Sequence, residues 1–278
     1  MSVSATAFGA EHPAARPPGA GFPTQTNPAA EMSGGWTMNT ILFDLDGTLL
    51  PMDQKAFLEA YFQELSAAFV HLGYDPEKLI RAVWVGTKTM IENDGSATNE
   101  ERFWEHFARI VGDRAKRDKP RFEEFYRNEF HRVRRAVSPH PLARECVRIV
   151  KEKGYTPVLA TNPIFPRAGT LARISWAGLD PDDFALITTY EDFHYCKPHP
   201  EYYREILQRL GKRPEECVMV GNDVREDMCA ARLGMDTFLL TDHLINEDRE
   251  DVSGYRQGGM NELRQWAEEL PAADRQRA

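Results

Sequence analysis

Two carboxylates, Asp44 and Asp46, directly follow a short apolar run at residues 40–43. Such a run is typical of a strand buried within a parallel sheet, and Gly47 interrupts it. The buried strands of open α/β sheets present polar groups at their carboxyl ends. Because a buried charge must be paired or bound to a metal, the segment predicts an anionic, chemically active edge of an α/β sheet.

Composition excludes several classes of protein. The chain has 278 residues and a formal net charge of -9, which argues against a nucleic-acid partner because phosphate binding needs a basic surface. No apolar run approaches the length of a membrane span, so we expect no integral membrane protein. The four cysteines lack the close spacing of a metal site and are interpreted as free thiols, which favours a cytoplasmic location. They are Cys146, Cys196, Cys217 and Cys229.

The chain divides into segments of different character. Residues 1–37 are rich in small residues and proline and are interpreted as a disordered N-terminal tail. Helical periodicity without strands dominates residues 52–135, with patterns at 77–92, 99–111 and 120–135. Strand and helix patterns then alternate. The predicted domains are an α/β core formed by 38–51 and 136–245, a helical cap at 52–135, and a C-terminal helix and tail at 246–278.

The alternation indicates a doubly wound parallel sheet covered on both faces. Strands are predicted at 155–161, 184–188, 217–221 and 237–240, and helices at 142–153, 167–176, 201–210, 227–233 and 260–269. The strand at 40–45 has no partner unless it joins this sheet. The helical segment is therefore predicted to be an insertion, with six aromatic residues forming its own core: Phe103, Trp104, Phe107, Phe122, Phe125 and Tyr126.

Polar residues follow the predicted strands in a pattern that suits phosphate chemistry. Thr161 and Asn162 follow one strand, Lys197 lies in a later loop, and Asp223 and Asp227 follow another strand. Parallel strands bring these ends to one edge. Carboxylates are the ligands that Mg²⁺ prefers, with a phosphate completing its shell, and a lysine can hold a phosphate oxygen.

The four segments together resemble the haloacid dehalogenase superfamily of phosphohydrolases over about residues 39–242. The resemblance implies that Asp44 is the nucleophile and Asp46 the general acid/base, whose backbone carbonyl binds the metal. It also implies that Thr161 and Asn162 bind the phosphoryl group, that Lys197 bridges the nucleophile and the phosphate, and that Asp223 and Asp227 serve Mg²⁺. A carboxylate at position 46 points to a phosphatase, since dehalogenases of this superfamily lack one there.

Some assignments leave alternatives open. The family often has Gly-Asp in its fourth motif, whereas Asn222 here separates Gly221 from Asp223. Counting four residues back from Asp227 selects Asp223 as the metal ligand, and counting five selects Asn222; charge favours Asp223. Alternatively, Asp227 only caps the helix that follows it.

The prediction is a Mg²⁺-dependent phosphatase that hydrolyses a small phosphorylated metabolite through an aspartyl-phosphate. Two alternatives remain: a phosphosugar mutase on the same core, and a non-catalytic binding protein that retains the fold. The sequence carries no signal for the oligomeric state.

Overall fold

The computed structural model describes residues 38–273, so the predicted tail at 1–37 lies outside the described residues. The centre of the fold is a parallel sheet of five strands in the order β2-β1-β3-β4-β5. The strands are β1 (Thr40–Phe43), β2 (Thr156–Leu159), β3 (Cys217–Gly221), β4 (Asp236–Leu240) and β5 (Arg256–Gly258). The prediction of a doubly wound α/β fold is confirmed.

Strand β1 lies between β2 and β3, and all four of its residues are buried. Phe43 is level with Leu159 of β2 and with Val220 of β3. The three strands therefore end at the same height. Whatever follows them in sequence meets at one edge of the sheet, which is the arrangement that the sequence predicted for the site.

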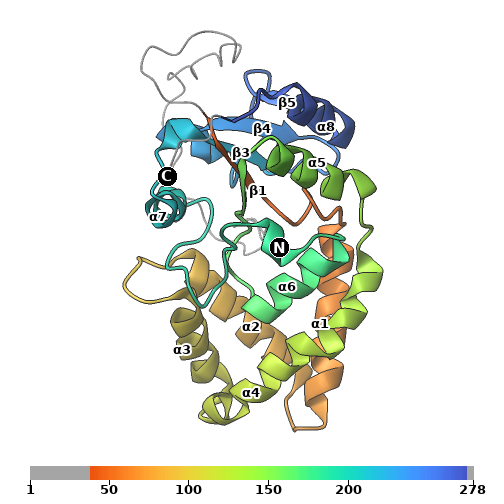
Figure 1. The fold of residues 1–278 in the computed structure, drawn as a ribbon. Helices are drawn as coiled ribbons and strands as arrows, with labels where there is room; N and C mark the ends of the chain where they lie inside the picture. The colour runs from red at the N-terminus through yellow and green to blue at the C-terminus, as the bar shows by residue number, and fades with distance from the viewer. Residues whose placement is uncertain (1–37, 274–278) are drawn as a thin grey trace.

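Alternate residues of each strand face opposite layers. Leu42 and Met219 pack with buried residues of α7 (Pro200–Leu210). Ile41 and Val218 belong to the larger apolar cluster on the other face, which includes α5 (Pro141–Glu152) and α8 (Met260–Glu269). The helices thus enclose the sheet from both sides (Figure 1).

A helical insertion connects β1 to α5 and extends away from the sheet in Figure 1. It consists of α1 (Gln54–Val70), α2 (Pro76–Ile91), α3 (Asn99–Val111), α4 (Arg114–Arg127) and the 3₁₀ helix η2 (Glu129–Ala136). Asp53, Asp75 and Thr98 cap the first three helices by accepting a backbone N–H with their side chains, which is why these helices begin where they do.

The core contacts this insertion through α6 (Arg167–Trp176), which packs against α4 and η2. Trp176, at the end of α6, is buried, and its ring lies 5.0 Å from that of Phe130 in η2. The segment after β2, which begins at the edge of the sheet and continues into α6, therefore also packs against the insertion.

Several predicted elements are wrong in kind or extent. Residues 184–188 run beside β2, and the N–H groups of Ala185 and Thr188 donate to the carbonyls of Pro157 and Leu159. They form only a single bridge, Leu159 to Ile187, and Pro157 has no N–H with which to extend the ladder. The helix predicted at 120–135 is instead α4, which begins at Arg114, followed by a break at Asn128. Residues Met228–Leu233 form a 3₁₀ rather than an α-helix, and β5 was not predicted.

Two further observations concern the described residues as a whole. All four cysteines are buried and free, as predicted. Among residues 38–273, no helix combines the length and the apolar character needed to cross a membrane.

Truncating Leu42 tests the central position of β1. Leu42 is fully buried between strands and α7, so Leu42→Ala is expected to lower the free energy of unfolding by about 2–5 kcal/mol. Leu72→Ala, at a residue that is 40% exposed, is expected to change it by less than about 0.5 kcal/mol. Urea unfolding followed by circular dichroism measures both, and equal effects would contradict this packing.

Candidate active site

The ammonium group of Lys197 lies between two carboxylates at the carboxyl edge of the sheet. Its Nζ is 2.9 Å from Asp44 Oδ1 and 2.7 Å from Asp227 Oδ1. Lys197 and Asp227 are each 1% exposed, and Asp44 is 6% exposed. The structure thus brings together the predicted nucleophile, the predicted lysine and one of the two predicted acidic residues of the fourth motif.

Burial and the charges of neighbouring groups shift the pKa values of Asp44, Asp227 and Lys197. Burial raises the pKa of Asp44 to about 6, with Asp227 and Asp46 adding to the rise and Lys197 opposing it. Burial also raises the pKa of Asp227, again against the effect of Lys197. Burial alone would lower the pKa of Lys197, but Asp227 and Asp44 hold it well above its usual value. Lys197 is therefore a fixed positive charge shared by two carboxylates.

Two glycines allow the strand ends to approach each other. A Cβ at Gly221 would lie 2.2 Å from the carboxyl group of Asp227, so a side chain there would displace the acid. Gly47 has φ +84°, and a Cβ on it would lie 2.5 Å from Asn222 Nδ2. Both positions therefore require glycine for steric reasons.

The two candidate ligands of the fourth motif make different contacts. Thr48 Oγ1 donates to Asn222 Oδ1 at 2.9 Å and lies 3.3 Å from Asp44 Oδ2. Asp223 Oδ1 instead accepts the backbone N–H groups of Arg225 and Glu226, both at 2.9 Å. The Asn222 side chain is thus connected with the predicted nucleophile through Thr48, whereas Asp223 contacts the cluster through its backbone N–H, which donates to Asp227 Oδ2 at 3.0 Å.

Thr161 and Asn162 follow β2 and are buried. Asn162 Oδ1 accepts the backbone N–H of Lys197 at 3.2 Å, and its Nδ2 donates to Glu226 Oε2 at 3.2 Å. The Thr161 carbonyl accepts the hydroxyl of Tyr202 at 2.9 Å. In this structure the Asn162 side chain holds the backbone of Lys197. This contact differs from the predicted binding of phosphate by Asn162.

Asp46, the predicted acid/base, forms a buried ion pair with Arg173 of α6. Arg173 also donates to the Gly169 carbonyl at 3.3 Å, and its guanidinium lies 4.2 Å from the ring centre of Phe165. Burial by itself raises the pKa of Asp46, but the guanidinium counteracts this, and the pKa of Asp46 lies below its usual value.

Sequence reasoning missed two residues of this site, Arg173 and Glu226. Both are buried. The available signal for Arg173 was its place on the same face of the predicted helix 167–176 as Gly169 and Trp176, where charge is costly unless it is paired. Its partner could not be identified from the sequence, because 127 residues separate it from Asp46.

The chemistry of the donor set suits a hard cation. Buried carboxylates at this edge are Asp44, Asp46, Asp223, Glu226 and Asp227, and the buried cations among the described residues are Lys197 and Arg173. Carboxylate and amide oxygens are typical Mg²⁺ ligands. As the side chains stand, however, no three Asp, Glu, His or Cys residues in the range 38–273 are grouped closely enough to hold a metal by themselves. A metal here would need backbone, amide or substrate oxygens as well.

A buried Asp–Lys–Asp cluster at the edge of a doubly wound sheet, beneath a helical insertion, defines a class of α/β hydrolases. The family model described as haloacid dehalogenase-like hydrolase matches residues 38–234. The chain belongs to this family, and the prediction that it is a hydrolase of the haloacid dehalogenase superfamily is confirmed.

Individual relatives agree with this assignment. "Pyrophosphatase PpaX" of Halalkalibacterium halodurans is 27% identical over 217 residues, which cover 76% of this chain and 87% of the relative. The protein of the same name from Bacillus pumilus is 25% identical, covering 72% of this chain and 82% of the relative. These relatives support a phosphatase rather than a dehalogenase.

Solved structures agree at the level of the fold. A HAD phosphatase from Thermococcus onnurineus aligns with a TM-score of 0.54 at 20% identity, covering 82% of this chain and 97% of that chain. The L-2-haloacid dehalogenase from Xanthobacter autotrophicus aligns with a TM-score of 0.53 at 14% identity, covering 84% and 100%. The same fold thus carries both chemistries, so the residues of the site must decide between them.

Removing the cation from the Asp46–Arg173 pair tests its role in the fold. Arg173→Met leaves a buried carboxylate without this partner and is expected to reduce the free energy of unfolding by about 3–5 kcal/mol. Adding Asp46→Asn to this variant is expected to recover a large part of the loss, because the two effects are coupled.

The matched control is Arg204→Met, which removes an exposed arginine paired with Glu201 on α7 and is expected to change stability little. Urea unfolding of five proteins is the measurement: the wild type, Arg173→Met, Asp46→Asn, the double variant and Arg204→Met. Additive effects of Arg173→Met and Asp46→Asn would contradict a direct ion pair.

Proposed function

We propose that this protein is a Mg²⁺-dependent phosphatase that hydrolyses a small phosphorylated metabolite through an aspartyl-phosphate. The observation that carries the proposal is the buried Lys197 ammonium between Asp44 and Asp227. The chain is a haloacid dehalogenase-like hydrolase, and a carboxylate beside a buried cation at the end of β1 supports a role for Lys197 in binding phosphate.

Asp44 is the proposed nucleophile. Its Oδ1 faces Lys197 and its Oδ2 faces the hydroxyl of Thr48, so both oxygens are oriented before substrate arrives. Attack on phosphorus forms the aspartyl-phosphate and releases the alcohol of the substrate. Lys197 offsets the negative charge that collects on the phosphoryl oxygens, while Thr161 and the loop at Asn162 bind the transferred group.

Asp46 is the proposed acid and base. It donates a proton to the leaving oxygen in the first step and takes one from water in the second. In the described structure its carboxylate bonds to Arg173, which favours the charged form. Proton transfer therefore requires the carboxyl group of Asp46 to turn away from Arg173 toward the substrate, and we assign this turn to substrate binding beneath the helical insertion.

Mg²⁺, when bound, would neutralise charge on the phosphate and on the nucleophile. We assign it to Asp44, the backbone carbonyl of Asp46 and the segment at 222–227. Within that segment the contact from Thr48 supports Asn222 as the oxygen donor, and Asp227 then serves as the partner of Lys197. Asp223 remains the alternative on charge alone.

The surroundings of the site support a small substrate. The helical insertion follows the segment that contains Asp44 and Asp46. It can close over the edge of the sheet, and this closure excludes water while the aspartyl-phosphate forms. The relatives are named as pyrophosphatases, so pyrophosphate is included among the candidate substrates. Buried, free cysteines are consistent with a reducing compartment, and we propose a cytoplasmic location.

Replacing the nucleophile tests the chemistry. Asp44→Asn keeps the shape of the side chain but cannot form the phosphoenzyme, so turnover is expected to fall by on the order of a thousandfold or more. Phosphate release from a panel of phosphate monoesters and pyrophosphate, with and without Mg²⁺, is the measurement. The control Asp180→Asn changes an exposed capping residue and should retain activity. Substantial turnover by folded Asp44→Asn would exclude the mechanism.

Two alanine variants distinguish the ligands of the fourth motif. Asn222→Ala is expected to weaken Mg²⁺ binding by at least about tenfold, and Asp223→Ala to weaken it less. The rise in melting temperature with Mg²⁺ concentration reports binding without requiring turnover. A larger loss in Asp223→Ala would identify Asp223 as the ligand instead.

A further inference from the structure

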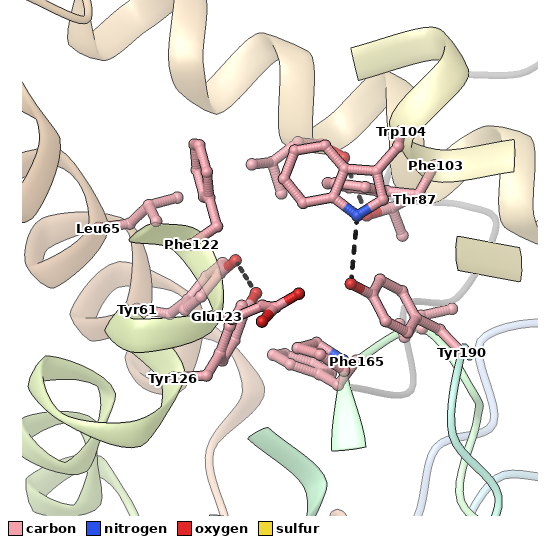
Figure 2. Close-up of a pocket in the computed structure, with 13 residues that line it drawn as sticks. Tyr61, Leu65, Thr87, Phe103, Trp104, Phe122, Glu123, Tyr126, Phe165 and Tyr190 are labelled. Atoms are coloured by element: carbon pink, nitrogen blue, oxygen red, sulfur yellow. Dashed lines mark hydrogen bonds between the residues drawn. The ribbon is translucent and has the colours of Figure 1, made fainter. Parts of the chain in front are cut away.

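A cavity lies between the helical insertion and the loop that follows β2 (Figure 2). None of the residues of the carboxylate cluster is part of its lining. It comprises about 580 Å³ of space, including open solvent at its mouth. Aromatic side chains dominate its lining, among them Tyr61, Trp104, Phe122, Tyr126, Phe165 and Tyr190. Four of these come from the insertion, whereas Phe165 and Tyr190 come from the core.

The polar atoms of the aromatic residues bond mainly to one another. The hydroxyls of Tyr61 and Tyr126 are 2.7 Å apart, and Trp104 Nε1 donates to the hydroxyl of Tyr190 at 3.3 Å. These bonds fix the rings. The π faces of aromatic rings carry a partial negative charge, so rings that line a cavity can attract a cation.

Glu123 is the one acidic residue of the lining, and no lysine, arginine or histidine lines the cavity. Figure 2 shows its carboxylate directed into the space between the rings. Arg127 Nη2 lies 3.8 Å from this carboxylate, but both side chains are substantially exposed, and such a pair contributes little. The residues that line the cavity therefore carry one formal negative charge and no positive one, which favours a cation over a second phosphate or a carboxylate as the occupant.

The cavity is connected to the catalytic cluster through one aromatic ring. Phe165 lines the cavity and also contacts the guanidinium of Arg173, which pairs with Asp46. Phe165 follows the predicted phosphate-binding residue Asn162 by three positions. A group held in the cavity therefore lies next to the loop that is proposed to bind the phosphate.

We propose that this cavity binds a small organic ammonium group. Aromatic faces and a carboxylate around one space are the arrangement that recognises alkylammonium ions, through cation–π attraction and charge. The binding site follows from the cavity alone. Its role as the site for the leaving-group end of the substrate, which would then be the phosphate ester of an amino alcohol, rests on the proposed function.

Calorimetric titration with tetramethylammonium chloride tests the site without turnover. Neopentyl alcohol is the neutral probe of similar shape, and sodium chloride at equal ionic strength controls for salt. The wild-type protein is expected to bind tetramethylammonium on the order of tenfold more tightly than the alcohol. Glu123→Gln is expected to remove most of that preference while leaving the affinity for the alcohol unchanged.

Glu124→Gln is the matched control. Glu124 is the next residue of α4 and lies 4.0 Å from Arg121, outside the lining, so its variant should bind as the wild type does. Equal affinity for the cation and the alcohol, no binding of the cation, or an unchanged preference in Glu123→Gln would each overturn the proposal.

Kinetics with phosphocholine and its neutral analogue 3,3-dimethylbutyl phosphate test the role in catalysis. We expect kcat/KM to favour phosphocholine in the wild type and this preference to fall about tenfold in Glu123→Gln. Cation binding without any phosphate release would overturn the proposed phosphatase but not the cavity site. Phosphate release without cation binding would overturn the cavity site alone.

Discussion

The shared ammonium of Lys197 is the interaction on which the sheet edge depends. It joins Asp44, which lies 153 residues away in the sequence, to Asp227, which lies 30 residues away. Because all three side chains are buried, the position of each charge depends on the other two. The pairing is possible because β1 and β3 are neighbours in register and because Gly221 leaves room for the Asp227 carboxylate. Packing of the sheet and charge compensation therefore support the same geometry.

A second buried pair, Asp46 with Arg173, extends this network into α6. Helix α6 packs on α4 and η2, so the carboxylate of Asp46 is connected to the helical insertion through Arg173 and α6. The ring of Phe165 lies between the guanidinium and the aromatic cavity. Events in the insertion can thus reach the proposed acid/base through two contacts, which suits an enzyme whose proton transfer should wait for substrate.

The sequence predicted most elements where local signals were strong. Residues 99–111, 167–176, 217–221 and 260–269 were predicted with their observed bounds, because caps, glycines and periodicity mark these ends. The strand predicted at 184–188 is reduced to one bridge with β2, because a strand depends on the donors of its neighbour and Pro157 lacks one. Phe122 belongs to the core of the insertion as predicted, and Trp104 and Tyr126 pack against it. That these three residues also line a cavity shared with Phe165 was not predicted.

By itself the sequence determined the α/β class, the inserted helices and the identity of Asp44, Lys197 and Asp227 as residues of one edge, because strand ends and residue types are local properties. Only the tertiary structure decided the partners: that Lys197 is shared, that Asn222 contacts Thr48, and that a distant guanidinium neutralises Asp46. The physical reason is that ion pairs and cavities form between side chains brought together by packing, and their distances are encoded in no single segment of the chain.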